Sequence, residues 1–234
     1  MLALPLLLGV AASRPSPWQL VLAAAALTGY LGSAALQAWT RARRAPAFQA
    51  PILVYGAAFG GLGLALVASF PSLLLALVVA VPAALVVFEG ARPGTRRDLA
   101  NSLAQVTQAL VLVPSAALVS GEVDLGPVVA YTLVAAAYLF GSVLVVRSVL
   151  RERGNDAFAL LSVGFHVVPI VPAAIALPWG YALVGAGLAA RAAALPLVQR
   201  HRAEGSHPLR PVHVGIVEMI ASLAVVLVSF AAPL

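Results

Sequence analysis

Most of this chain is divided into apolar segments that are about as long as a lipid bilayer is thick. An α-helix needs roughly 20 apolar residues to cross the hydrocarbon layer. The composition is far from that of a soluble domain, because 62% of the 234 residues are hydrophobic, only 9% are charged and the mean hydropathy is +1.01. The sequence therefore predicts an all-α fold, a polytopic transmembrane helix bundle that forms a single domain over residues 1–234.

We predict about nine spans, of which the first is short. In chain order they are Met1–Ala12, Trp18–Thr40, Ala50–Ser69, Pro71–Phe88, Leu99–Ser120, Gly126–Val146, Ala157–Leu177, Trp179–Val198 and Val212–Phe230. We interpret the first as the latter part of a helix, since it has neither the basic start nor the cleavage site of a signal peptide. None of the connections that lack arginine is long enough to hold a soluble domain.

The basic residues predict the orientation of these spans. All fourteen are arginines, and twelve of them fall, three at a time, in four alternate connections, those after the second, fourth, sixth and eighth spans. Short loops rich in positive charge remain on the cytoplasmic side of the membrane. The opposite connections contain only Arg14. We therefore expect the N-terminus inside and the C-terminus outside.

A polar stripe follows the charged loop that precedes the fifth span. Asp98, Asn101, Gln105 and Gln108 are spaced three, four and three residues apart, so an α-helix places them on one face. Such a face should point away from lipid and could contact a ligand. The alternative is that the amides hold neighbouring helices together through interhelical hydrogen bonds.

Three ionisable residues lie well inside predicted spans, several residues from the nearest span end, in the cytoplasmic half or the middle of the membrane. They are His166, Arg191 and Glu218. Arg191 and Glu218 occupy similar depths on consecutive antiparallel spans, which predicts an ion pair. Charged residues inside a membrane normally face the bundle interior or a cavity, so we expect a polar pocket that opens to the cytoplasm. Alternatively, the ion pair only locks two helices together, and His166 only bonds a backbone carbonyl freed by Pro169 or Pro172.

Loop arginines are candidates for the rim of this pocket. They are Arg92, Arg96, Arg97, Arg147, Arg151 and Arg153. The planar guanidinium group holds phosphate or carboxylate oxygens through two hydrogen bonds at once. An amphipathic anion would fit, with its head at the rim and its tail between helices. The other interpretation is that these arginines serve only to orient the protein.

Several function classes have no support in the residues. There is no cysteine, which excludes disulfides and thiolate metal sites. No HExxH, GxSxG or P-loop pattern is present, and no GxGxxG pattern precedes a helix. The net charge of +6 does not indicate nucleic-acid binding, because the arginines are distributed among the loops instead of forming one patch.

Three stretches together resemble the YwiC-like bacterial membrane proteins. They are RPGTRRDLANSLAQ at 92–105, GSVLVVRSVLRERGN at 141–155 and RPVHVGIVEM at 210–219, and the likeness in segment order covers most of the chain. Members of that family usually begin with an Arg-Glu-His-Gly type stretch that leads into the first helix. This chain starts at Met1, just beyond where that stretch would lie. We therefore expect either that the start was assigned late or that the stretch is lost.

The nine-span layout of that family is similar to the UbiA-type prenyltransferases, whose pocket also opens to the cytoplasm. The similarity implies a prenyl diphosphate held through Mg²⁺ by aspartate-rich motifs after spans two and six. Here the first of those loops, TRARRAPAFQAP, has no acidic residue, and the second, VRSVLRERGNDAF, has only Glu152 and Asp156. We therefore predict no metal site and expect arginines to replace the metal. The sequence predicts no particular cofactor.

Three hypotheses for function follow. As an enzyme, the protein would be a prenyltransferase-like transferase with Glu218 or His166 as the base. As a transporter, it would use the same residues as a substrate or proton path, although the outer half of the helices shows almost no polar residue. As a subunit of a membrane complex, it would join helices of a partner. In each case we expect a multi-pass protein of the bacterial inner membrane that is surrounded by lipids and binds no nucleic acid. As an enzyme or a transporter, it would bind an amphipathic or anionic, prenyl-phosphate-like molecule. The oligomeric state is not predicted.

Overall fold

The computed structural model describes residues 2–42, 45–90, 99–121, 123–204 and 208–234. Within these ranges the chain forms helices and short connections without any β-strand, which confirms the predicted all-α class. The chain divides into two compact units, Met1–Thr132 and Leu133–Leu234, which are described separately below.

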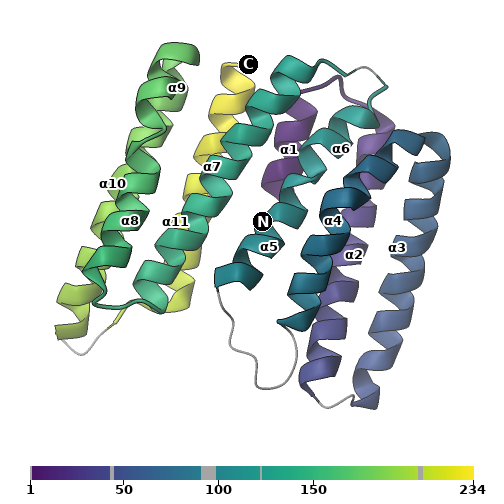
Figure 1. Cartoon of the computed structure of the whole chain (residues 1–234), viewed down its shortest axis with the longest axis horizontal. Helices are drawn as coiled ribbons and strands as arrows, with labels where there is room; N and C mark the ends of the chain where they lie inside the picture. Colours follow the sequence, from purple (N-terminus) through teal and green to yellow (C-terminus); the bar gives the residue numbers. More distant parts are fainter. Residues whose placement is uncertain (1, 43–44, 91–98, 122, 205–207) are drawn as a thin grey trace. The chain divides into compact units, whose positions relative to one another are not determined.

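The first unit contains the helices drawn from purple to teal in Figure 1. They are α1 (Ala3–Ala11), α2 (Pro17–Arg41), the 3₁₀ turn η1 (Pro46–Phe48), α3 (Gln49–Ser69), the 3₁₀ turn η2 (Pro71–Leu73), α4 (Leu74–Glu89), α5 (Leu99–Leu110), α6 (Leu112–Leu118) and the start of α7 (Leu125–Leu150). Helix α2 lies against α3, α4 against α5, and α1 against α6. Large apolar side chains of α3 and α4, among them Leu53, Leu64 and Leu75, are exposed, as expected for a surface that faces lipid.

Seven helical segments are long and apolar enough to cross a membrane. Their bounds are Pro17–Arg41, Pro46–Ser69, Pro71–Glu89, Leu125–Leu150, Asp156–Ala176, Trp179–Ala203 and Pro211–Ala231, and each coincides with a predicted span. This agreement supports a multi-pass membrane protein.

The two other predicted spans are not single long helices in the structure. The first, α1, has only 9 residues. The segment predicted at 99–120 consists of α5 and α6, which are separated at Val111. Pro114 accounts for the interruption, because proline cannot donate a hydrogen bond to the carbonyl four residues earlier, that of Leu110, and its ring crowds that carbonyl. The total of nine crossings remains a prediction.

Gln19 connects the start of α2 to the end of α6 within the first unit. Its amide Nε2 donates to the Ala116 carbonyl at 3.2 Å and to Ser13 Oγ at 3.0 Å. The last carbonyls of a helix have no partner within the helix, so a buried amide stabilises this end of α6. Helices α1 and α6 approach closely at Gly9, where a Cβ atom would lie 2.6 Å from Ala116 Cβ and 2.7 Å from the Val113 carbonyl oxygen.

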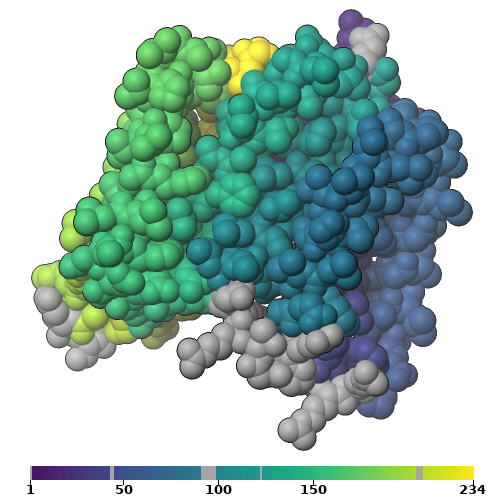
Figure 2. All heavy atoms as spheres, in the orientation of Figure 1, coloured from purple at the N-terminus to yellow at the C-terminus, as the bar shows by residue number. Residues whose placement is uncertain are grey.

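The second unit contains the rest of α7, α8 (Asp156–Val167), α9 (Ile170–Ala176), α10 (Trp179–Glu204) and α11 (Pro211–Ala231). Helix α10 packs against α8, α9 and α11. The bend between α8 and α9 follows from Pro172, which cannot donate to the Val168 carbonyl. The bright green surface of this unit in Figure 2 belongs to α8 and α9. The turn from α7 to α8 uses Gly154 with a φ of 78°, a conformation that glycine adopts easily.

Candidate functional site

A buried ion pair joins α10 to α11 in the second unit. Arg191 Nη1 of α10 lies 2.7 Å from Glu218 Oε1 of α11, and the two side chains are only 7% and 15% exposed. The pair predicted from the sequence is therefore formed. Two buried opposite charges each lose water on folding, and their mutual attraction offsets that cost when the geometry is good.

Helix α7 supplies further hydrogen bonds to Glu218, one to its carboxylate and one to its backbone carbonyl. Ser142 Oγ donates to Glu218 Oε2, and Tyr138 Oη donates to the Glu218 backbone carbonyl at 2.8 Å. The Tyr138 ring also faces the Arg191 guanidinium, with 5.8 Å from Cζ to the ring centroid, which is within the range of a cation–π interaction. Residues of α7 and α10 thus both bind Glu218 of α11, and these contacts fix the orientation of its side chain.

His166 of α8 joins the same cluster. Its Nδ1 lies 2.7 Å from the Ser162 carbonyl oxygen, which can only accept, so Nδ1 carries the proton of that bond. In the neutral ring this leaves a lone pair on Nε2, which lies 3.4 Å from Arg191 Nη2. Helix α7 accommodates the ring because Gly141 has no side chain, and a Cβ atom there would lie 2.6 Å from Nε2.

The alternative prediction for His166, that it only bonds a backbone carbonyl freed by a proline, agrees with the structure in part. The imidazole does bond a backbone carbonyl, but this carbonyl belongs to Ser162. Carbonyls freed by Pro169 and Pro172 would be those of Phe165 and Val168, four residues before each proline. The contact with Arg191 places His166 beside the ion pair, so the catalytic interpretation stays a hypothesis.

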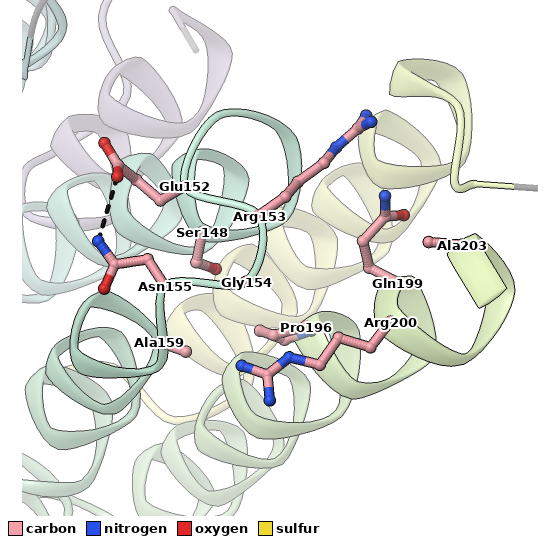
Figure 3. A pocket seen from close by; sticks show the side chains of 10 residues that line it. All are labelled: Ser148, Glu152, Arg153, Gly154, Asn155, Ala159, Pro196, Gln199, Arg200 and Ala203. Atoms are coloured by element: carbon pink, nitrogen blue, oxygen red, sulfur yellow. Dashed lines mark hydrogen bonds between the residues drawn. The ribbon is translucent and has the colours of Figure 1, made fainter.

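A cavity of about 320 Å³ lies where the turn between α7 and α8 meets the C-terminal part of α10 (Figure 3). Its lining residues are Ser148, Glu152, Arg153, Gly154, Asn155, Ala159, Pro196, Gln199, Arg200 and Ala203. Asn155 begins α8, where its Oδ1 accepts from the Phe158 amide at 3.1 Å, and its Nδ2 donates to Glu152 Oε2 at 3.3 Å. The same side chain therefore caps the helix and shapes the cavity wall.

Gln199 and Arg200 form the α10 side of the cavity. Gln199 Oε1 accepts from the Leu209 amide at 2.7 Å, which fixes the orientation of this buried side chain. Arg200 forms an ion pair with Asp156 of α8, and both groups are well exposed to solvent. These contacts hold α8 and α10 together at the cavity.

The predicted rim arginines of the α7–α8 turn have different roles. Arg153 lines the cavity, and its Nε donates to the Val149 carbonyl at 3.2 Å. Arg147 is turned toward Glu152, with 3.2 Å between Nη2 and Oε1. Arg151 is exposed and does not line the cavity. Arg92, Arg96, Arg97 and Asp98 lie outside the described residues.

The amides of the predicted polar stripe belong to the first unit. Asn101 is buried, Gln108 is half-buried and Gln105 is exposed. Asn101 packs against Gly90 at the end of α4, where a Cβ atom would lie 2.9 Å from the Asn101 amide. The absence of a side chain at Gly90 thus lets α4 and α5 approach each other around a polar group.

Sequence reasoning did not select four residues of the second unit as site residues: Tyr138, Ser142, Gln199 and Arg200. Gln199 carried a usable signal, since a buried amide near the end of an apolar span needs a partner. Tyr138 and Ser142 carried none, because these residue types are common in membrane helices and their role depends on facing Glu218. Over the described ranges, no group of three or more His, Asp or Glu side chains could hold a metal ion.

Comparison with known proteins identifies the family. The model of the YwiC-like protein family matches residues 1–117, half of the 234-residue chain. No curated protein and no solved structure matches the chain. Of the three stretches that carry the resemblance, only that at 92–105 lies within the matched residues, and the cavity and the ion pair lie beyond them. The chain therefore belongs to the YwiC-like protein family.

Proposed function

We propose that this multi-pass membrane protein binds an amphipathic anion, of the prenyl-phosphate type, with the anionic head in the cavity between α7, α8 and α10. The observation that carries the proposal is the cavity itself, which combines arginine and amide donors with apolar helices. Its volume of about 320 Å³ is at the lower end of the range typical of ligand pockets. It suits a phosphate head group better than a whole lipid.

The arginines of the cavity are suited to an anionic head group. Arg153 has no carboxylate partner in the described part of the chain, and Arg200 pairs with an exposed Asp156. Exposed ion pairs contribute little to stability, so a phosphate can take the place of Asp156 at low cost. In Figure 3 the Arg200 side chain extends from α10 toward α8, while the guanidinium of Arg153 points away from it. Arg153 is exposed and can change its rotamer to meet a ligand.

The apolar part of the ligand would follow the neighbouring helices. Ala159, Pro196 and Ala203 form an apolar part of the cavity wall. Leu160, Leu161 and Leu197 lie on the same two helices, α8 and α10, with their side chains exposed where lipid would surround the protein. A prenyl or acyl tail lying along these helices would replace lipid at no hydrophobic cost.

The proposal includes an orientation in the bacterial inner membrane. The cavity lies at the ends of α7 and α10 that carry the arginines, and such ends face the cytoplasm under the positive-inside rule. The ligand would therefore enter from the cytoplasm or from the cytoplasmic leaflet.

Binding of farnesyl diphosphate tests this proposal, with farnesol as the matched ligand that lacks the phosphates. We expect calorimetry on the purified protein in nanodiscs to show binding of the diphosphate only. Charge-assisted hydrogen bonds contribute about 1.5–3 kcal/mol each, so the double variant Arg153→Gln with Arg200→Gln should weaken binding by roughly a hundredfold or more. Arg202→Gln is the control, because Arg202 is exposed on the same helix and does not line the cavity. Equal binding of farnesol, or unchanged affinity of the double variant, would contradict the proposal.

If the bound ligand also reacts, the protein would be a prenyltransferase-like transferase. A prenyl group would form a bond to an acceptor, diphosphate would leave, and the proton of the acceptor would pass to a base. Of the two candidates, His166 has the longer contact with the arginine, 3.4 Å from Nε2 to Arg191 Nη2. Glu218 Oε1 lies 2.7 Å from Arg191 Nη1, and Oε2 also accepts from Ser142, which favours His166 as the base. Diphosphate release in the same incubations is the readout. Unchanged release after Glu218→Gln together with His166→Ala would remove both bases from the proposal.

A further inference from the structure

The buried polar atoms of the second unit that have no hydrogen-bond partner among the described residues include three on α8 and α10. These three are Ser162 Oγ on α8 and Arg191 Nε and Gln199 Nε2 on α10. The three residues are 0%, 9% and 3% exposed. A buried polar atom without a partner is costly, and in folded proteins such atoms are usually satisfied by ordered water.

These atoms lie in order along two packed helices. On α8, Ala159, Ser162 and His166 are spaced three and four residues apart and so share one face. On α10, Gln199 follows Arg191 by eight residues, which is roughly 12 Å along the helix axis. The helices touch at both ends of this stretch, through His166 with Arg191 and through Asp156 with Arg200.

One end of this stretch borders the cavity, and the other borders the ion pair. At one end, Ala159 and Gln199 line the cavity. At the other, His166 and Arg191 contact each other beside Glu218. Ser162 lies between them on α8, one turn from His166, and its own carbonyl accepts the imidazole proton. Each turn of α8 between Ala159 and His166 therefore offers water at least one polar group.

We infer that water from the cavity reaches the Arg191–Glu218 pair through a polar track formed by Gln199, Ser162, His166 and Arg191. Water on this track supplies partners to all three unsatisfied atoms. It also places the Glu218 carboxylate in contact with the aqueous phase on the cavity side, so that protons can exchange there. The inference does not depend on the identity of the ligand in the cavity.

Silver ions provide a probe of this track, because they are small, move with water and bind thiols tightly. The chain has no cysteine, so a single Ser162→Cys substitution places one thiol on the track with little change of shape. The protein in liposomes is treated with silver nitrate and then unfolded, and the thiols that remain free are counted with a maleimide dye. We expect silver ions to block the thiol of Ser162→Cys at a rate within about a factor of ten of the rate for Ala159→Cys. Ala159 lines the cavity and so serves as the positive control.

Leu161→Cys is the matched negative control. Leu161 precedes Ser162 in α8, and its side chain is exposed where lipid would surround the helix. An ion enters hydrocarbon reluctantly, so blocking there should be slower than at Ser162 by about a hundredfold. If Ser162→Cys is as slow as Leu161→Cys while Ala159→Cys reacts and all three proteins are folded, there is no water track. If the Ser162→Cys rate matches that of Ala159→Cys, the inference is supported.

Discussion

Glu218→Gln is expected to destabilise the protein by about 3–5 kcal/mol, the usual effect of removing one member of a buried ion pair. Glutamine keeps the shape of the side chain and can still accept from Ser142, and the Tyr138 hydrogen bond to the backbone carbonyl of residue 218 is not altered. The loss therefore comes from Arg191, whose charge would remain buried without its carboxylate. Thermal unfolding of the purified protein in detergent, followed by circular dichroism, should show a clearly lower Tm.

A double-mutant cycle separates this ion-pair effect from general disruption. Arg191→Met alone should also destabilise the protein, because it leaves the Glu218 charge unpaired. Combined with Glu218→Gln, it should restore part of the lost stability, since no buried charge then remains. Strictly additive losses would mean that the two side chains do not interact, contrary to the 2.7 Å contact.

Gly9→Ala is expected to destabilise the first unit by about 1–3 kcal/mol, the usual cost of overpacking a close contact. The added Cβ atom would lie 2.6 Å from Ala116 Cβ and 2.7 Å from the Val113 carbonyl oxygen. The nearest atoms belong to the backbone or to a short side chain, so they cannot rotate away and α1 must shift relative to α6. The expected result is a lower Tm together with faster proteolysis near the N-terminus.

Gly63→Ala in α3 is the matched control for Gly9→Ala. A Cβ atom at Gly63 meets no other atom within 4 Å. Alanine is favoured over glycine inside a helix by about 1 kcal/mol, so this variant should be as stable as the natural protein or slightly more stable. Equal loss of stability in the two variants would show that the close contact at Gly9 is not the cause.

The positions of the long helices could be predicted because the requirement for hydrocarbon-length apolar segments is strict. The span predicted at Trp18–Thr40, for example, is helix α2 at Pro17–Arg41. The pairing of Arg191 with Glu218 was predictable for a similar reason. Two isolated opposite charges at one depth in an apolar environment have few other partners.

The rest of the site depends on how helices face each other, which no local pattern encodes. Ser142 contacts Glu218 only because α7 and α11 present those faces to each other. The cavity likewise arises where the turn at Gly154 meets α10, and turn geometry is not visible in hydropathy. The interruption between α5 and α6 was missed because the apolar pattern continues through Val111, although Pro114 was a signal for it.

We predict that the arginine-bearing connections all lie on the cytoplasmic side of the membrane, so that the cavity opens there. Single cysteines at Ala42, Val123 and Arg151 can be labelled in inverted and right-side-out vesicles with a membrane-impermeant maleimide, since the chain has no cysteine of its own. We predict labelling of Ala42→Cys and Arg151→Cys from the cytoplasmic face and of Val123→Cys from the opposite face. Labelling of Ala42→Cys and Arg151→Cys from opposite faces would show that α5 and α6 do not cross the membrane together, and would contradict the account.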